Sequence, residues 1–197
     1  MIKLFCIFIL LFSSLAIHAQ LPEKINQWQQ MLAADKFDGE LQCILFSSNQ
    51  LIYLGTTAGI YEYDGTDFKL ISNPELNKQN ITCLFQDADA VIWAGLNNGK
   101  LVQYTKNKCT LFQPQEGLPK TAISKIQVDA QKRLWFATQG EGIYVYHKQK
   151  LYNINTDDGL SDNYIYDMEL LPNNSIAAAS DRGLSLIYFD GIKKTID

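Results

Sequence analysis

The sequence is poor in the residues and motifs that usually carry catalysis. It has two histidines among 197 residues, and His18 falls within an N-terminal apolar segment, which leaves His147 for the rest of the chain. His147 ends the strand-like run IYVYH, which is typical of an exposed strand end. No nucleophile elbow, phosphate-binding loop or pair of thiols at metal-binding spacing is present. The residues therefore predict a chain that is not an enzyme and that binds no metal or cofactor.

Cysteine and positive charge are also scarce. Cys6 lies in the apolar N-terminal segment, and the other three cysteines are an odd number that cannot all pair within the chain. Cys43 and Cys83 each sit among apolar neighbours and are predicted to be small buried hydrophobic residues rather than a disulfide. The net charge is −4 and no basic stripe occurs. This balance argues against nucleic acid or an anionic membrane surface as a partner.

The first 19 residues have the pattern of a secretory signal peptide. Lys3 precedes an apolar run from Leu4 to Phe12, and small residues lead to a cleavage site after Ala19. The run is short for a membrane span, which needs about 20 apolar residues, although a retained anchor is the alternative. We therefore expect a periplasmic or secreted protein with no membrane span after cleavage. Residues 20–40 lead into the remainder and are predicted to hold one short helix.

Outside residues 23–35 the sequence has no long window of helical periodicity, and it repeats instead. Tyr53, Trp93 and Trp135 are spaced by 40 and then 42 residues, and the same step leads to Ala177. The repeats cover 41–80, 81–122, 123–164 and 165–197. In the third, four strand-like runs are bounded by turn residues, namely 123–128, 133–137, 142–147 and 150–154.

Four antiparallel strands in about 42 residues predict a β-propeller blade, so the fold class is all-β with about four blades. The second strands, such as LIYLG and VIWAG, are apolar on both faces, which indicates coverage by a blade on each side. Trp93 and Trp135 are therefore expected in the core. The four blades either close into a small ring or form an open arc of a larger propeller. We favour the arc, whose two end faces would promote self-association or continuation into further blades.

Several motifs resemble those of the periplasmic two-component regulator propeller. They are ISKIQVD (123–129), the segment GIYEYDG (59–65) that follows a glycine turn, and the links EGLPKTAISKI (116–126) and DGLSDNYIYDM (158–168). The resemblance covers roughly residues 37–197. It implies the extracytoplasmic sensing part of a membrane receptor, often a hybrid histidine kinase that responds to carbohydrate fragments. Such receptors carry more repeats, a β-sandwich, a transmembrane helix and cytoplasmic signalling domains, so the resemblance implies that this chain is the N-terminal part of one.

Candidate ligand-binding residues lie where loops should converge. In a blade, the turn between the second and third strands and the link to the next blade share one end, and binding residues gather on such loops. Asn98, Glu141 and Arg182 are the predicted ligand-binding residues at that end. The acid pairs Asp87/Asp89 and Asp157/Asp158 are interpreted as turn formers, since NINTDDG (153–159) lacks the spacing of a calcium loop.

Three hypotheses follow. The first is a non-catalytic sensor module of a two-component receptor, with an oligosaccharide as its ligand. The second is a secreted or periplasmic scaffold that docks another protein through its blade faces. The third is a propeller-type lyase or hydrolase, against which the single strand-end histidine counts.

Overall fold

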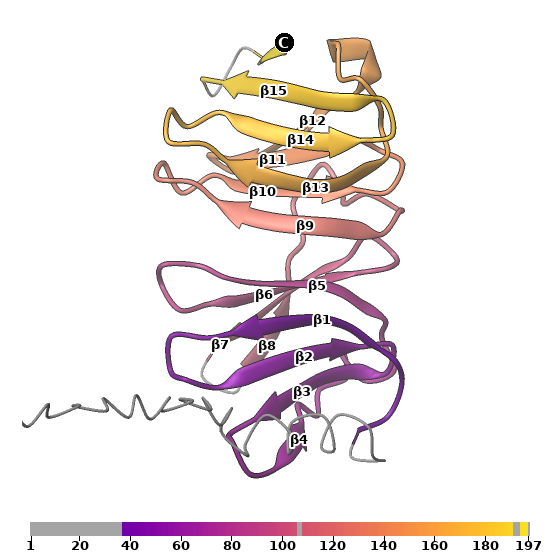
Figure 1. Cartoon of the computed structure of the whole chain (residues 1–197), viewed down its shortest axis with the longest axis vertical. Coiled ribbons are helices and arrows are strands. Elements are labelled where there is room, and N and C mark those ends of the chain that lie inside the picture. The colour runs from indigo at the N-terminus through magenta and orange to yellow at the C-terminus, as the bar shows by residue number, and fades with distance from the viewer. Residues whose placement is uncertain (1–36, 106–107, 191–193, 197) are drawn as a thin grey trace, which may run out of the picture. The chain divides into compact units, whose positions relative to one another are not determined.

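The computed structural model describes residues 37–105, 108–190 and 194–196. Their backbone forms sixteen strands and one short 3₁₀ helix, η1 (Thr156–Asp158) (Figure 1). The predicted all-β class is therefore confirmed. No helix within these residues is long and apolar enough to cross a membrane. The predicted signal peptide, and the segment leading into the first repeat as far as residue 36, lie outside the described residues.

The strands form four antiparallel sheets of four, each in simple sequence order. We call these sheets the first to fourth blades. The first contains β1 (Leu41–Phe46), β2 (Ile52–Thr56), β3 (Gly59–Tyr63) and β4 (Phe68–Leu70). The second contains β5 (Ile81–Gln86), β6 (Ile92–Leu96), β7 (Leu101–Thr105) and β8 (Lys108–Leu111). The third contains β9 (Ile123–Val128), β10 (Leu134–Thr138), β11 (Ile143–His147) and β12 (Lys150–Ile154). The fourth contains β13 (Ile165–Leu170), β14 (Ile176–Ser180), β15 (Gly183–Phe189) and β16 (Lys194–Ile196).

The repeat extends to individual backbone angles. The turn between the first two strands of each blade has one residue with positive φ, at Gln50, Ala90, Lys132 and Asn174. A β-bulge also recurs near the start of β1, β5, β9 and β13, where the register of pairing shifts. Bulges re-aim side chains at the rims of closed or nearly closed sheets. The four blades therefore share one backbone design.

Each blade buries its apolar residues against the next one. The second-strand aromatics Tyr53, Trp93 and Trp135 are all buried, which confirms their predicted place in the core. The small residue two positions later allows a close approach, because a Cβ on Gly95 would lie 2.7 Å from the Cβ of Ile123 in the next blade. The thiol of Cys83 also packs closely against Gly95, on the neighbouring strand of the same blade. Cys43, Cys83 and Cys109 are free thiols.

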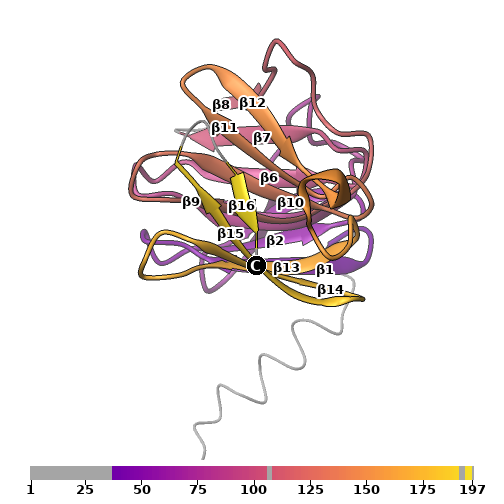
Figure 2. The same cartoon turned by 90° about the horizontal axis from the view of Figure 1, so that it is seen from above.

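The first strands of successive blades lie next to one another, since β1 contacts β5, β5 contacts β9 and β9 contacts β13. Viewed along this row of blades, β1 and β13 lie on one side and the outer strands β8 and β12 on the other (Figure 2). No described strand covers the outer faces of the first and fourth blades, which we call the two end faces. Ile44 and Phe46 on β1 are 62% and 69% exposed, and Leu184 on β15 is 64% exposed. The described residues thus form an open arc of four propeller blades.

Candidate functional site

The turns between second and third strands meet the links between blades at one end of the sheets. The N–H of Asn97 donates to the carbonyl of Asn80 in the preceding link, and Gln139 donates in the same way to Ala122. The N–H groups of Gly140 and Gly142 both donate to the carbonyl of Asn163 in the following link. This arrangement brings the predicted loop regions together. We call this end of the blades the loop face.

Asn98 lies in the β6–β7 turn of the second blade and is exposed. Its side-chain oxygen accepts a hydrogen bond of 3.2 Å from the backbone N–H of Lys100. The neighbouring Gly99 packs closely on the next link, because a Cβ there would lie 2.0 Å from the carbonyl oxygen of Pro119. The turn that carries Asn98 is therefore held in place, while its side chain faces solvent.

Glu141, in the β10–β11 turn of the third blade, joins this turn to the link before it. Its carboxylate accepts hydrogen bonds from the backbone N–H groups of Lys120 and Thr121, at 2.8 and 3.1 Å. It also accepts one of 2.9 Å from the hydroxyl of Tyr144. Partial burial acts to raise the pKa of Glu141, but these hydrogen bonds together outweigh it and hold the pKa below its usual value. The charged carboxylate thus ties the β10–β11 turn to the preceding link, and we call this set of contacts the Glu141 clamp.

Arg182 lies in the β14–β15 turn of the fourth blade and is exposed. Its Nε lies 3.4 Å from Oδ2 of Asp162, which belongs to the link before the fourth blade. The arginine side chain is 76% exposed, so this pair holds its position without removing it from solvent. Asn98, Glu141 and Arg182 stand on three successive blades, and no hydrogen bond or ion pair joins them among the described residues.

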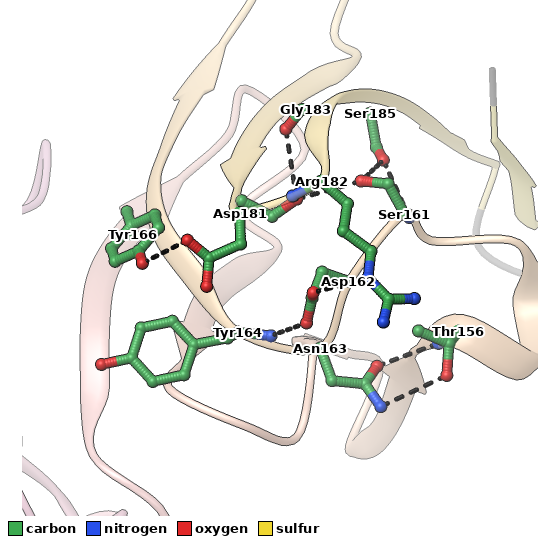
Figure 3. A network of polar contacts seen from close by, with 11 residues as sticks. Thr156, Ser161, Asp162, Asn163, Tyr164, Tyr166, Asp181, Arg182, Gly183 and Ser185 are labelled. Atoms are coloured by element: carbon green, nitrogen blue, oxygen red, sulfur yellow. Dashed lines mark hydrogen bonds and ion pairs between the residues drawn. The ribbon is translucent and has the colours of Figure 1, made fainter.

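Two exposed tyrosines beside Arg182 were not predicted. Tyr164 and Tyr166 are 36% and 52% exposed, and their ring centroids are 5.1 Å apart. The hydroxyl of Tyr166 donates a 2.6 Å hydrogen bond to Asp181, while the N–H of Tyr164 donates to Asp162 (Figure 3). The hydrogen bond to Asp181 raises the pKa of Tyr166 above its ordinary value. Aromatic surface, carboxylates and a guanidinium therefore occur together on the loop face of the fourth blade.

The β-bulge in β13 explains how Tyr166 reaches this position. The pairing shifts between Ile165 and Asp167, so Tyr166 occupies the unpaired place in the strand. The same place is held by Thr82 in the second blade, whose hydroxyl bonds to the backbone carbonyls of Gly95 and Ile123. The sequence carried a signal in the segment NYIYD, where two tyrosines flank a buried isoleucine.

A polar network supports the link below the tyrosines. Asn163 accepts from the N–H of Thr156, and its amide donates to the hydroxyl of the same residue at 3.3 Å (Figure 3). The hydroxyl of Ser161 lies 3.1 and 2.9 Å from those of Ser180 and Ser185. These contacts fix both flanks of Asp162 and so orient its carboxylate toward Arg182.

Of the four acidic residues interpreted as turn formers, Asp87 and Asp158 bond to the local backbone, while the carboxylate of Asp89 pairs with Lys132. Asp87 accepts hydrogen bonds from the N–H groups of Asp89 and Val91 in its own turn. Asp158 closes a capping box with Asn155 at the start of η1. Within the described part of the chain, no three His, Cys, Asp or Glu residues are grouped so that they could hold a metal ion. His147 lies at the end of β11 beside Lys150, in the hairpin that leads to β12.

The sheets, their order and the blade-to-blade packing define a protein of the β-propeller class. The chain is similar to the extracellular domain of the hybrid two-component system BT4673 from B. thetaiotaomicron, with 23% identity and a TM-score of 0.64. That match covers 76% of this chain and 21% of the other. The corresponding domain of BT3049 from the same organism is 19% identical, with a TM-score of 0.59, and the match covers 73% of this chain and 19% of that one.

A third similar structure is an enzyme. Virginiamycin B lyase from Staphylococcus aureus is 15% identical, with a TM-score of 0.62, and the match covers 80% of this chain and 55% of the lyase. No protein-family model and no curated protein matches the sequence. These likenesses establish the fold. The two-component neighbours also agree with the resemblance that the sequence motifs indicated, and the chain spans about a fifth of their length.

Proposed function

We propose that this chain is a non-catalytic ligand-binding module of an extracytoplasmic receptor, and that it recognises an oligosaccharide on its loop face. The observation that carries the proposal is the exposed pair Tyr164 and Tyr166 beside Asp162, Asp181 and Arg182. The similarity to extracellular domains of two-component systems supports a location outside the cytoplasm. It also supports a role as one part of a longer receptor.

The chemistry of the cluster suits a sugar. The C–H groups of a pyranose ring pack against an aromatic face, and its hydroxyls require donors and acceptors in fixed positions. Tyr166 supplies a ring whose hydroxyl is already held by Asp181. Asp162, in the link before the fourth blade, supplies a partly exposed acceptor, and Arg182, in the β14–β15 turn, supplies an exposed donor beside it. Because the loops rest on paired strands, these groups are positioned before a ligand arrives.

A glycan array followed by calorimetry tests this proposal. We expect a bound oligosaccharide whose affinity falls about tenfold or more, equal to about 1.4 kcal/mol, in Tyr166→Ala and Arg182→Ala. Asn98→Ala and Glu141→Ala test whether the site extends to the second and third blades. Tyr188→Ala is the matched control, since Tyr188 is an exposed tyrosine on β15 that takes no part in the network. Equal losses in Tyr188→Ala and Tyr166→Ala would contradict a site at the tyrosine pair.

A second candidate function is a scaffold that docks a protein through the end faces of the arc. Ile44 and Phe46 at one end and Leu184 at the other expose apolar side chains that an adjoining blade would cover. A partner that co-purifies with the chain, and is lost in Phe46→Lys, would support this function. A lyase is the remaining alternative, and it requires turnover of a substrate that depends on His147. Absence of turnover by the unmodified chain would count against a lyase, and turnover that persists in His147→Ala would show that His147 is not the catalytic residue.

A further inference from the structure

In the third blade, Asp129 and Trp135 together form one wall of the space between the third and fourth blades. Oδ1 of Asp129 accepts the N–H groups of Gln131 and Arg133, both at 2.9 Å. Its Oδ2 accepts the indole N–H of Trp135 at 2.8 Å. The aspartate thereby fixes both its own turn and the plane of the indole ring, which faces the fourth blade.

Arg133 fills the space beside this wall. Its Nε donates to Oδ2 of Asp129, and its Nη1 donates to the carbonyl of Phe189 in the fourth blade. The guanidinium carbon lies 5.4 Å from the ring centroid of Trp135 and 5.6 Å from that of Phe189. The arginine side chain is only 6% exposed. The junction between the third and fourth blades therefore holds a buried guanidinium between a carboxylate and two aromatic rings.

The second blade repeats the wall without the arginine. Oδ2 of Asp87 accepts the indole N–H of Trp93 at 2.9 Å, and Oδ1 accepts two backbone N–H groups of the turn. Val91 stands at the position that Arg133 occupies one repeat later. Among the described residues, Oδ2 of Asp87 has the Trp93 donor and no cation beside it. The carboxylate and the indole are thus present while the guanidinium is missing.

A cavity of about 400 Å³ lies at this junction between the second and third blades. Asp87, Trp93, Phe112 and Tyr146 contribute to its lining. Phe112 packs edge-on against both other rings, at centroid distances of 5.6 Å from Trp93 and 4.9 Å from Tyr146. At the rim, Lys132 pairs with Asp89 at 3.1 Å, and both side chains are largely exposed. The lining therefore combines an aromatic floor with a carboxylate.

We propose that this cavity binds a guanidinium group, supplied by a small molecule or by an arginine side chain of another chain. A guanidinium is planar, stacks on aromatic rings and donates along its edge to a carboxylate, which is the geometry that Arg133 adopts one junction further on. An ammonium group lacks the flat face and is more strongly hydrated. The site lies at the β5–β6 and β9–β10 turns, away from the loop face, so it does not rest on the proposed oligosaccharide site.

The first test uses N-acetyl-arginine amide as the probe, with the citrulline analogue as a neutral match and the lysine analogue as an ammonium match. The readout is the indole N–H signal of Trp93 in a ¹H–¹⁵N spectrum, assigned with Trp93→Phe. We expect a saturable shift with the arginine probe that exceeds the shift with either match at least fivefold, while the Trp135 signal stays in place. Equal shifts with arginine and citrulline, or no shift up to the solubility limit, would overturn the proposal. Tighter binding of Gly-Arg-Gly than of the single amide would identify a peptide source, and equal binding a small molecule.

The second test supplies the guanidinium from the chain itself. Val91→Arg reproduces the sequence of the third blade, and Val91→Met fills similar space without charge. We expect Val91→Arg to melt about 2–4 °C above Val91→Met, and this difference to vanish when Asp87→Asn is added to both. Val91→Arg should also abolish the shift caused by the arginine probe. Identical melting of the two variants in both backgrounds would contradict a guanidinium site beside Asp87.

Discussion

Asp87 and Asp129 occupy the same place in successive repeats, yet their surroundings differ. Both fix a turn and accept an indole N–H. Asp129 is also buried with the guanidinium of Arg133, whereas Asp87 is only half-buried and no described cation pairs with it. The motif predicts the turn and the tryptophan contact, because both are local in sequence. The motif does not predict that the Asp129–Arg133 ion pair is buried. That burial depends on the contact with Phe189, which lies 56 residues after Arg133.

This difference predicts unequal effects of removing the two carboxylates. Asp129→Ala leaves the buried Arg133 cation unpaired, so we expect a loss of about 3–5 kcal/mol in the free energy of unfolding. Asp87→Ala removes hydrogen bonds without stranding a cation and should cost about 1–3 kcal/mol. Urea denaturation of both variants measures the difference. Asp89→Ala serves as the control, since its exposed pair with Lys132 contributes about 0–1 kcal/mol. Equal losses at Asp87 and Asp129 would show that the arginine pair adds nothing to the stability.

The hydrogen bonds of Glu141 predict that the stability of the fold depends on pH. Its pKa in the folded chain lies below the usual value because three hydrogen bonds favour the carboxylate. The resulting stabilisation is present above the ordinary pKa of a glutamate and is lost as the pH falls through the lowered value. We therefore expect the melting temperature of the unmodified chain to exceed that of Glu141→Gln most at pH 6–7, and the two to converge near pH 3.

Thermal melts from pH 7 to pH 3 measure this convergence. Glu116→Gln is the control, because Glu116 is an exposed residue in the link that Glu141 binds. Its difference from the unmodified chain should stay constant over the same range. A constant difference for Glu141→Gln as well would mean that the clamp does not depend on charge. The same measurement helps to interpret Glu141→Ala in the proposed binding test, since a loss of loop structure at Glu141 would weaken binding of an oligosaccharide indirectly.

Among the elements, the second strand of each blade shows most clearly what the sequence pattern can predict. The run of apolar residues on both faces predicts a doubly covered strand, and β6 and β10 are buried throughout. The alternation of a large and a small residue predicts close blade contacts, which Gly95 and Ile123 make. The β-bulge in the first strands was not predicted, because one extra residue leaves the apolar pattern nearly unchanged. Tyr166 was overlooked for that reason.

The close approach at Gly95 predicts a steric cost that depends on the next blade. A Cβ at this position would lie 2.6 Å from Sγ of Cys83 and 2.7 Å from the Cβ of Ile123. We expect Gly95→Ala to lower the stability by about 1–3 kcal/mol, as overpacking of a core usually does. Ala179 holds the corresponding place in β14 but is exposed, since no described blade covers it. Ala179→Val should therefore change the stability by less than about 0.5 kcal/mol. Chemical denaturation compares the two, and similar losses would mean that the fourth blade is covered on that face.

In the molecule as a whole, the repeat length predicted the number of blades and the strand order, because each blade is built from contacts within about 42 residues. The strand order also predicted that the turns between second and third strands lie at the same end of the blades as the links, since alternate hairpins must point in opposite directions. The periodic pattern alone did not identify the cluster of tyrosines, carboxylates and arginine on the fourth blade. There, Arg182 pairs with Asp162 across a turn and a link, and Tyr166 pairs with Asp181 across a bulge. Such pairs depend on side chains that the repeat leaves free to vary.

The open arc predicts association between copies of the chain. Ile44 and Phe46 at one end lie on a different surface from Leu184 at the other, so contact between the two faces is head-to-tail and can close a ring or extend a filament. We expect the mass measured by light scattering to rise with protein concentration. Phe46→Lys and Leu184→Lys should each abolish this rise, and their melting temperatures should stay within about 2 °C of the dilute unmodified chain, because both side chains are already exposed.

Leu70→Lys on the outer strand β4 is the control and should associate normally. If Phe46→Lys alone prevented association, the interface would instead join two first blades. A constant monomer mass for the unmodified chain would show that the end faces do not bind one another.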